Sequence, residues 1–367
     1  MSQPDAVSEL IPVTPVEVLI ARALRELWAE PELRVDSATP FGDGHSGFTY
    51  RIELTSRRHR GWFVARLSPP GARIAGPADI GRQGRIMAAL GRAGLAVPAI
   101  LAADSTGLAG GRALMVMEHV DGAHWSQVAE RHGQHVVPRA AVDFLHQLRA
   151  LHPATFALTD SPPSTPAADV DRWAALLPRC PDWLREPAAA LHRDLLASAP
   201  AGAPMGLVHG DFHYGNMLFR EQDIAAVFDW EIASIGDPRL DLGSLAVASL
   251  RARYHPEPNP TGSVEISVDE LCDLYGIRPA DALWFIAAGC LKYAAILGYN
   301  LDLHRRGKRP DPMYEDLVGT MAGLAADGRA LLRRGAVAVE GDVGRPHGGV
   351  PTDYPDGGDD PGERSAQ

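Results

Sequence analysis

One short stretch near the middle of the chain constrains its fold more than any other feature. Asp211 follows a histidine and a glycine, Asn216 stands five residues later, and Asp229 lies thirteen residues beyond Asn216. Two short apolar runs between Asn216 and Asp229, separated by a polar turn, predict a hairpin that brings both side chains to the same end. Amide and carboxylate oxygens suit Mg²⁺, and a further carboxylate can take a proton from an attacking hydroxyl. The spacing therefore predicts a phosphoryl-transfer site.

Each polar residue of this stretch has a predicted role. We predict that Asp211 is the catalytic base, and that Asn216 and Asp229 hold Mg²⁺ against the phosphates of ATP. His209 is interpreted as a brace for the loop rather than as a chemical group. Glu231 is a candidate for a group behind the metal ligands or for a ligand of a second metal.

Four neighbouring residues support the loop or face its substrate. We interpret Asp237 and Asp241 as structural acids that brace the loop by pairing with Arg239 or with backbone amides. His213 stands two residues past the predicted base. It fits a substrate contact and an exposed loop histidine equally well.

Taken together, these motifs resemble the aminoglycoside phosphotransferase/choline kinase superfamily, whose catalytic loop has the pattern H-G-D-x-x-x-x-N. Residues 209–216 match that loop, and residues 229–242 look like its metal-binding segment. The resemblance is strongest to the subgroup that includes the kinase-like domain fused to some acyl-CoA dehydrogenases. It covers roughly residues 15–335 and is most specific at 207–243. It implies an α+β, two-lobed protein-kinase-like fold, with a small β-rich N-lobe and a larger, mainly helical C-lobe.

The first third of the chain carries features that suit nucleotide binding. A glycine-rich segment at 42–47 contains Ser46, and its small residues would let backbone amides approach phosphate oxygens. A plain hairpin turn is the alternative. By the resemblance, Arg66 stands where protein kinases have the phosphate-binding lysine, and it would supply a permanent positive charge. Gln83 stands where the acidic partner is expected, and it can hydrogen-bond Arg66 but cannot neutralise it.

The strand that ends the small lobe resembles the hinge between kinase lobes. By that resemblance, backbone groups of Glu118 and Val120 would contact the adenine of ATP. We therefore predict three parts of the chain. Residues 1–120 form a nucleotide-binding N-lobe that begins with a helix, 121–335 form a C-lobe with the catalytic loop, metal site and acceptor pocket, and 336–367 form a disordered acidic Gly/Pro-rich tail.

Apolar periodicity predicts the elements within these parts. A helix over 16–27 precedes the small lobe, and residues 79–93 form a helix weakened by two glycines. Strands are predicted at 49–54, 62–67, 97–102 and 113–120. In the large lobe, helices are predicted at 183–197 and at 282–303, the second of them buried.

Length and composition agree with a soluble enzyme. The chain has 367 residues, of which 46% are hydrophobic, enough for a core in two lobes. Its net charge of −11 argues against general nucleic-acid binding. With no run of 18 or more apolar residues and no N-terminal signal pattern, we expect a cytoplasmic protein without a membrane segment. The three cysteines are far apart and are expected to be reduced thiols.

Two classes of function fit this sequence. The first is an ATP-dependent O-phosphotransferase that moves the γ-phosphoryl of Mg-ATP to a hydroxyl of a small molecule. The second is a nucleotide-binding regulatory pseudokinase, which Arg66 and Gln83 suggest. The presence of Asp211, Asn216 and Asp229 together favours the enzyme, because a scaffold has no need of all three.

The acceptor remains open within the enzyme class. An antibiotic kinase competes with a metabolic kinase for an anionic hydroxy acid or hydroxyacyl-CoA. No acidic cluster of the kind that cationic antibiotics require is evident in the late helices. Basic residues at 304–309 fit either an anionic acceptor or a solvated helix C-terminus. Tyr293, Tyr299, Asn300 and Asp302 are candidates for lining the acceptor pocket, and helix packing explains them as well.

Overall fold

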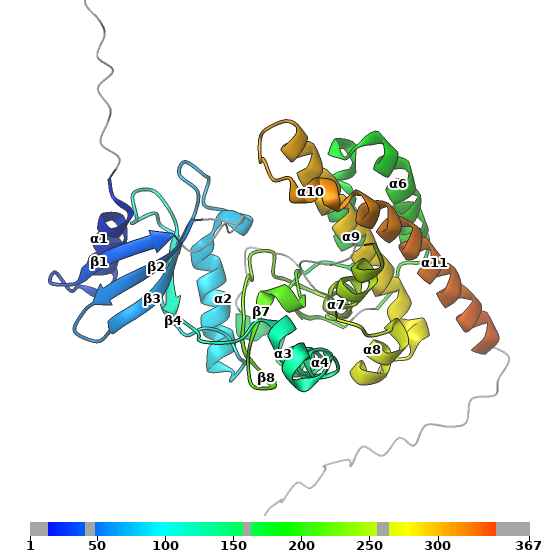
Figure 1. The fold of residues 1–367 in the computed structure, drawn as a ribbon, viewed down its shortest axis with the longest axis horizontal. Coiled ribbons are helices and arrows are strands. Elements are labelled where there is room, and N and C mark those ends of the chain that lie inside the picture. Colours follow the sequence, from blue (N-terminus) through cyan, green and yellow to red (C-terminus); the bar gives the residue numbers. More distant parts are fainter. Residues whose placement is uncertain (1–13, 41–47, 157–162, 203, 255–263, 343–367) are drawn as a thin grey trace, which may run out of the picture.

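The chain folds into two lobes of different composition. A computed structural model describes residues 14–40, 48–156, 163–202, 204–254 and 264–342. The first lobe contains a five-stranded sheet, and the second, larger lobe is built mainly of helices (Figure 1). The predicted α+β, two-lobed architecture is confirmed.

The small lobe is an antiparallel sheet between two helices. Its elements are α1 (Val16–Trp28), β1 (Arg34–Pro40), β2 (Phe48–Thr55), β3 (Arg60–Leu67), the 3-10 turn η1 (Gly76–Ala78), α2 (Ile80–Arg92), β4 (Ile100–Asp104) and β5 (Leu114–Glu118). The strands lie in the order β1-β2-β3-β5-β4, and every neighbouring pair is antiparallel. Helix α1 packs with one face of the sheet and α2 with the other.

Strand β3 presents a charged side chain to the interior. Successive side chains of a strand point to opposite faces. Ala65 and Leu67 accordingly join the apolar cluster beneath α1, while Val64 packs with the cluster that contains α2. Arg66 shares the α2 face with Val64 and is buried there. Because β3 is paired on both sides, by β2 and β5, this arginine is held on a central strand.

Two glycines in α2 lower its helix propensity but allow the helix to pack closely on the sheet. A Cβ at Gly81 would lie 2.6 Å from the carbonyl oxygen of Asp104, and one at Gly84 would lie 2.7 Å from the Cβ of Ala103. The helix predicted over 79–93 is therefore confirmed. The same glycines that weaken it in isolation are needed for its packing.

The large lobe surrounds a long helix with shorter ones. Its helices are α3 (Trp125–His132), α4 (Val136–Arg149), α5 (Pro166–Ala174), α6 (Asp182–Ala197), α7 (Arg239–Arg251), α8 (Val268–Tyr275), α9 (Pro279–Arg305), α10 (Met313–Asp316) and α11 (Val318–Asp342). Its strands are β6 (Gly206–Val208), β7 (Met217–Arg220), β8 (Asp223–Val227) and β9 (Ser234–Gly236). Short 3-10 turns are η2 (Pro153–Phe156), η3 (Leu177–Arg179), η4 (Tyr214–Asn216) and η5 (Ala252–Tyr254).

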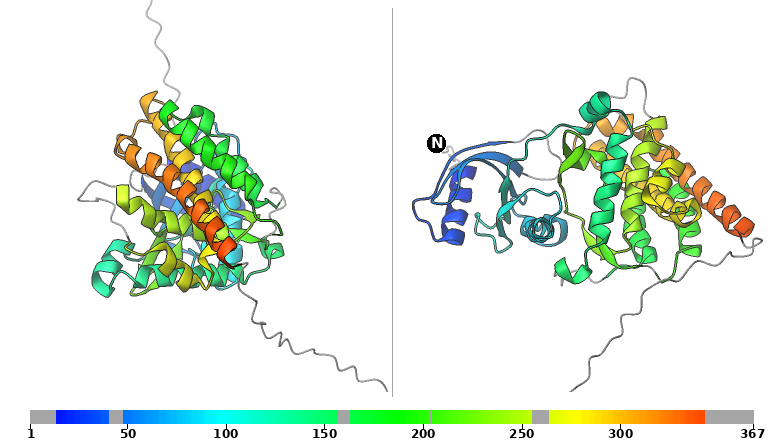
Figure 2. Two further views of the ribbon diagram at one scale, coloured as in Figure 1. Left: turned by 90° about the vertical axis from the view of Figure 1, so that its right-hand side faces the viewer. Right: turned by 90° about the horizontal axis from the view of Figure 1, so that it is seen from below.

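Helix α9 is the central element of this lobe and confirms the buried helix predicted at 282–303. It packs against α5, α6, α7 and α11, within the bundle of helices that forms the large lobe in Figure 2. By length and apolar composition α9 is able to cross a membrane, but 78% of its most apolar window is buried inside the lobe. Its apolar surface is thus covered by the protein's own helices.

Helices α7 and α9 cross at two glycines. A Cβ at Gly243 would lie 2.2 Å from the carbonyl oxygen of Phe285, and one at Gly289 would lie 2.7 Å from the carbonyl oxygen of Gly243. Real Cβ atoms do not approach backbone oxygens so closely, so only glycine fits at either position. The close crossing brings Ser244 of α7 next to Lys292 of α9.

Gly243→Ala is expected to lower the free energy of unfolding by about 1–3 kcal/mol, because the added methyl group forces two helix backbones apart. The matched control is Gly319→Ala on α11, where the nearest atom would lie 3.8 Å from the new Cβ. That change should be neutral or slightly stabilising. Urea denaturation of both variants measures their free energies of unfolding. Equal values would show that the α7–α9 crossing can accommodate a methyl group at residue 243.

Three elements differ from the prediction. The strand predicted at 97–102 is displaced along the chain, because β4 runs from Ile100 to Asp104. Strand β1 was not predicted, because its sequence, Arg34–Pro40, is mostly polar and exposed and it forms the edge of the sheet. Helix α11 continues to Asp342, so regular structure extends beyond the boundary predicted at residue 335. Alanines and valines at 336–339 continue the helix although glycines flank them. The rest of the predicted tail, 343–367, lies outside the described residues.

Candidate active site

The catalytic loop, residues 209–216, connects two short β-ribbons. Strand β6, which leads into the loop, pairs with β9, and β7, which leaves it, pairs with β8. The amide of Phe228 donates to the carbonyl oxygen of Asn216 at 2.9 Å, which closes the open end of the β7–β8 hairpin. The predicted hairpin is confirmed. It sets Asn216 and Asp229 side by side at that end.

Asp211 is held by hydrogen bonds at both carboxylate oxygens. The Tyr293 hydroxyl donates to Oδ1 at 2.7 Å, and His213 Nε2 lies 3.5 Å from Oδ2. Burial alone would raise the pKa of Asp211, but the hydrogen bonds and charges of His213, Lys292 and Tyr293 hold it below its ordinary value. The side chain is 30% exposed. Asp211 is thus an ionised carboxylate that still reaches solvent, as a base requires.

His209 braces the loop from beneath, as predicted. It is fully buried, and its ring packs 4.4 Å from the ring of Trp230. Burial lowers its pKa to about 4, so the imidazole is neutral. Nε2 lies 2.7 Å from the carbonyl oxygen of Phe228 and therefore carries the proton, while Nδ1 accepts from the amide of Asp211 at 3.1 Å. These two hydrogen bonds of His209 hold the backbone at Asp211 in place.

Two buried acids hold the other side of the loop, again as predicted. Asp241 accepts from the amides of His209 at 2.7 Å and Gly210 at 2.9 Å. Burial raises the pKa of Asp241 to about 7, against the two amide hydrogen bonds, which lower it. Asp237 accepts from the backbone and the guanidinium of Arg239, with Nη2 at 2.7 Å. Asp241 thus anchors the start of the loop to α7, whereas Asp237 holds Arg239 at the N-terminal end of that helix.

Asp229 has a left-handed backbone conformation, with a φ of 61°. This region is unfavourable for most residues but tolerated by aspartate and asparagine. Conformational strain of this kind is often kept where it positions a functional side chain. The Asp229 side chain is 22% exposed, and its carboxylate contacts Arg66.

Arg66 of the small lobe meets Asp229 of the large lobe. Arg66 Nη1 lies 3.3 Å from Asp229 Oδ1 and 3.4 Å from Gln83 Oε1. The predicted contact between Arg66 and Gln83 is present. Glutamine cannot neutralise the guanidinium, and the Asp229 carboxylate supplies a negative charge in contact with it. The arginine therefore reaches the same point as the candidate metal ligands.

Asn216 and Asp229 form a donor set that fits Mg²⁺. Asn216 Nδ2 donates to the carbonyl oxygen of Asp211 at 2.8 Å, so its Oδ1 is left to ligate a cation. The described residues hold no group of three or more His, Cys, Asp or Glu arranged for a metal. A site with two protein oxygens suits Mg²⁺, which usually takes its remaining ligands from phosphates and water.

A third carboxylate increases the negative charge at this point. Burial and the charge of Asp229 raise the pKa of Glu231 to about 7, opposed by Arg66 and Arg309. Such mutual repulsion among acids is relieved by a bound cation. The electrostatics thus favour a cation at the candidate metal site.

The structure gives less information on the other predicted nucleotide-binding residues, Ser46, Glu118 and Val120. Ser46 and the glycine-rich segment 42–47 lie outside the described residues. The amide of Glu118 donates to the carbonyl oxygen of Ala99, and the Glu118 carboxylate accepts from the Ala99 amide. The Glu118 amide is therefore already engaged. Val120 is half-buried just beyond the end of β5.

The predicted acceptor residues divide into two groups. Tyr293 contacts the base, as described above. Tyr299 instead lies under the guanidinium of Arg179, and Asp302 pairs with Arg306, so both are explained by local packing. In the basic segment at 304–309, Arg305 pairs with Glu315 at 2.7 Å. The contact of Arg305 is that of an ordinary helix terminus, whereas the charge of Arg309 acts on Glu231 beside the candidate metal site.

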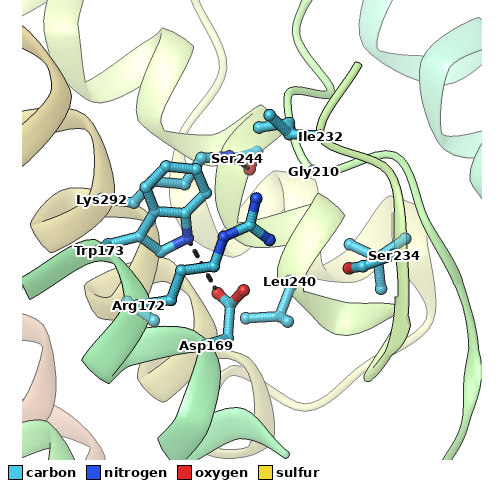
Figure 3. Close-up of a pocket in the computed structure, with 12 residues that line it drawn as sticks. Asp169, Arg172, Trp173, Gly210, Ile232, Ser234, Leu240, Ser244 and Lys292 are labelled. Carbon is cyan, nitrogen blue, oxygen red and sulfur yellow. Dashed lines mark hydrogen bonds between the residues drawn. The ribbon is translucent and has the colours of Figure 1, made fainter. Parts of the chain in front are cut away.

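Three residues near the base were not assigned a role from the sequence. Arg251 ends α7, and its positive charge acts on Asp211 and Tyr293. Ser244 and Lys292 lie behind the base, beside a cavity of about 20 Å³. Figure 3 shows both around this cavity, with Trp173. In the sequence, a lysine within the apolar middle of α9 was the feature from which a role for Lys292 could have been predicted.

Solved structures share this fold at low sequence identity. A Ralstonia eutropha JMP134 protein provisionally named an aminoglycoside phosphotransferase is 19% identical, with a TM-score of 0.63, covering 85% of this chain and 98% of that one. A choline/ethanolamine kinase family protein of Mesorhizobium loti is 20% identical, with a TM-score of 0.54, covering 88% and 98%. The fold is thus that of the aminoglycoside phosphotransferases and their kinase-like neighbours.

Sequence comparison gives the family. A model of the phosphotransferase enzyme family matches residues 37–264, more than half of the chain. The protein therefore belongs to the phosphotransferase enzyme family, as the motifs indicated.

Curated relatives are longer proteins. Acyl-CoA dehydrogenase family member 11 of Rattus norvegicus is 25% identical over 333 residues, 81% of this chain and 40% of that protein. Its Homo sapiens counterpart is 28% identical over 265 residues, 64% of this chain and 32% of that protein. The chain spans less than half the length of the curated relatives it matches.

Proposed function

We propose that this protein transfers the γ-phosphoryl group of Mg-ATP to a hydroxyl of a small molecule. The observation that carries the proposal is the juxtaposition of an ionised, partly exposed Asp211 with Asn216 and Asp229 at the end of one hairpin. Arg66 reaches the same point from the small lobe. Membership of the phosphotransferase enzyme family supports the reaction class.

The chain's own residues would act as follows. Asp211 orients the acceptor hydroxyl and takes its proton as the oxygen–phosphorus bond forms and the bond between the γ-phosphorus and the ADP oxygen breaks. Asn216 and Asp229 would hold Mg²⁺, which when bound neutralises phosphate charge. Arg66 would donate to phosphate oxygens, exchanging part of its contact with Asp229 for the nucleotide.

Nucleotide use has support from the structural neighbours. One aminoglycoside phosphotransferase of the same fold was solved with GDP and kanamycin, and another with AMP-PNP and hygromycin B. We propose ATP as the donor and a small molecule as the partner, without nucleic acid or membrane, in the cytoplasm. A pseudokinase would not require Asp211, Asn216 and Asp229 together, so their presence favours the enzyme over the pseudokinase.

Arg251 bears on the chemical class of the acceptor, and it favours an anionic acceptor. Its Nε is buried, and among the residues that the structure describes it has no hydrogen-bond partner there and no ion pair. A guanidinium held close to the base is suited to bind a carboxylate or phosphate. This favours a metabolic kinase for an anionic hydroxy acid or hydroxyacyl-CoA over an antibiotic kinase.

A screen of acceptors tests the proposed function. ADP release would be followed with Mg-ATP and a library of hydroxyl compounds that contains aminoglycosides, macrolides, choline, hydroxy acids and hydroxyacyl-CoAs. We expect at least one compound to raise ADP release well above the rate with water alone. ATP binding without stimulation by any compound would favour the pseudokinase.

Arg251→Gln is expected to raise KM for an anionic acceptor by about 10–100-fold, because a charge-assisted hydrogen bond is lost. KM for ATP should stay the same. Arg253→Gln, which removes an exposed charge two residues away, is the control and should leave both values unchanged. If Arg251→Gln left the acceptor KM unchanged, the argument for an anionic acceptor would fail.

A further inference from the structure

We propose that Lys292, Ser244 and Tyr293 form a hydrogen-bonded chain that holds the carboxylate of Asp211 in its reactive position. Tyr293 is the positioning residue in contact with the base, and the other two act through it. The inference rests on the proposed function, since it assigns residues to the same phosphoryl transfer. It concerns Ser244 of α7 and two residues of α9, which lie outside the segments 209–216 and 229–242.

Two of the three links are hydrogen bonds in the structure. Lys292 Nζ lies 3.3 Å from Ser244 Oγ. The Tyr293 hydroxyl donates to Asp211 Oδ1 at 2.7 Å. The Ser244 side chain lies near enough to lower the pKa of Tyr293 against the larger effect of burial, and the hydrogen bond between these two hydroxyls is the inferred link. The close α7–α9 crossing described above brings these side chains together.

The direction of every proton in this chain is fixed by its ends. An ammonium group can only donate, and an ionised carboxylate can only accept. Lys292 therefore donates to Ser244 and Tyr293 donates to Asp211, and in the proposed arrangement Ser244 donates to Tyr293. Hydrogen bonds aligned in this way polarise one another. The positive charge of Lys292 is thus passed toward the base through two hydroxyl groups.

The three side chains of this hydrogen-bonded chain are buried, and hydrogen bonds are stronger in a buried, low-dielectric environment. The exposed fractions are 5% for Lys292, 2% for Ser244 and 8% for Tyr293. A buried ammonium is costly unless other groups compensate it. Burial lowers the pKa of Lys292, and the charges of Asp211, Asp169 and Asp241 oppose that shift. Its Nζ also lies 5.3 Å from the centre of the Trp173 ring, in the arrangement seen in Figure 3.

In this arrangement the two carboxylate oxygens of Asp211 have different roles. Oδ1 is occupied by the Tyr293 hydroxyl, and burial holds the pKa of Tyr293 well above its ordinary value, so this group stays a donor. Oδ2 has only the longer contacts of Asn216 Nδ2 at 3.4 Å and His213 Nε2 at 3.5 Å, so we assign to it the uptake of the acceptor's proton. Loss of the Tyr293 hydroxyl would let the carboxylate rotate, which affects the chemical step rather than nucleotide binding.

Tyr293→Phe in the full chain tests the proposal. We expect kcat to fall by about 10–100-fold, the range for one hydrogen bond to a charged group. KM for ATP and the melting temperature should stay near their wild-type values. Tyr275→Phe is the matched control, because its hydroxyl is buried in the same lobe but interacts with Arg149 instead of the base. It should leave kcat unchanged.

Ser244→Ala and the double variant test whether the residues act as a unit. Ser244→Ala alone should lower kcat, but it should add nothing to Tyr293→Phe, because its effect passes through the tyrosine. Unchanged kcat in Tyr293→Phe overturns the proposal. So does a fall of kcat that is accompanied by equal losses of ATP affinity and thermal stability, which would indicate general damage.

The failure of this inference is distinguishable from failure of the proposed function. Turnover by the wild type tests the function alone. If the wild type turned over no acceptor, a crystal structure of Tyr293→Phe would still decide the positioning role. We expect the Asp211 carboxylate to leave its wild-type orientation in that variant, and an unchanged orientation would overturn the inference.

Discussion

Asp211→Asn is expected to abolish most phosphoryl transfer while keeping the fold and ATP binding. Asparagine matches aspartate in shape, and its carbonyl oxygen can still accept from the Tyr293 hydroxyl. It cannot accept the proton of the acceptor hydroxyl. Loss of a general base typically costs about 10²–10⁴-fold in rate. The measurement is kcat on an identified acceptor at saturating Mg²⁺, with ATP affinity measured separately by calorimetry.

An exposed aspartate provides the control for this experiment. Asp194 pairs with Arg329 on the surface, and Asp194→Asn should leave kcat unchanged because exposed ion pairs contribute little. Near-wild-type turnover by Asp211→Asn would show that another group, or no group, takes the proton. The role assigned to Asp211 would then be wrong.

Asp229→Asn is expected to weaken the Mg²⁺-dependent part of ATP binding by at least about 10-fold. Loss of even an indirect partner of a metal costs about 10–100-fold in affinity, and this change removes the charge of a ligand. Asparagine is preferred to alanine here because it tolerates the left-handed backbone at φ 61°. The fold should therefore be retained. Calorimetric titration of ATP with and without Mg²⁺ measures the effect.

Binding of ATP without Mg²⁺ should not weaken in this variant. Removing the Asp229 charge also releases Arg66 from its contact at 3.3 Å, which leaves the guanidinium available to phosphates. Glu221→Gln, an exposed acid at the turn of the same hairpin, is the control. An unchanged Mg²⁺ dependence in Asp229→Asn would mean that the metal is held elsewhere.

The local part of the site could be predicted because its residues lie close together in the sequence. The hairpin fixes Asn216 relative to Asp229, and a five-residue spacing fixes Asp211 relative to Asn216. The bracing role of His209 followed from the same motif. The long apolar helix α9 was predicted from its composition alone. In each case the pattern is short-range, and a single hydrogen-bonded element determines the outcome.

Contacts between distant segments could not be predicted in the same way. Tyr293 and Asp211 are 82 residues apart, and Arg66 and Asp229 are 163 residues apart. Which side chains meet depends on how closely helices cross, and that is set by glycines such as Gly243, whose role is visible only once the partner backbone is known. The edge strand β1 was missed because an exposed edge needs little apolar sequence.

Transfer of a labelled phosphoryl group tests the central claim most directly. Wild-type protein and Asp211→Asn would be incubated with Mg²⁺, the acceptor library and ATP whose γ-phosphoryl carries heavy oxygen. Products would be identified by mass spectrometry. We predict that at least one hydroxyl compound gains a labelled phosphate with the wild type and not with Asp211→Asn. Binding of Mg-ATP by the wild type without labelling of any compound would contradict the proposed phosphotransferase activity.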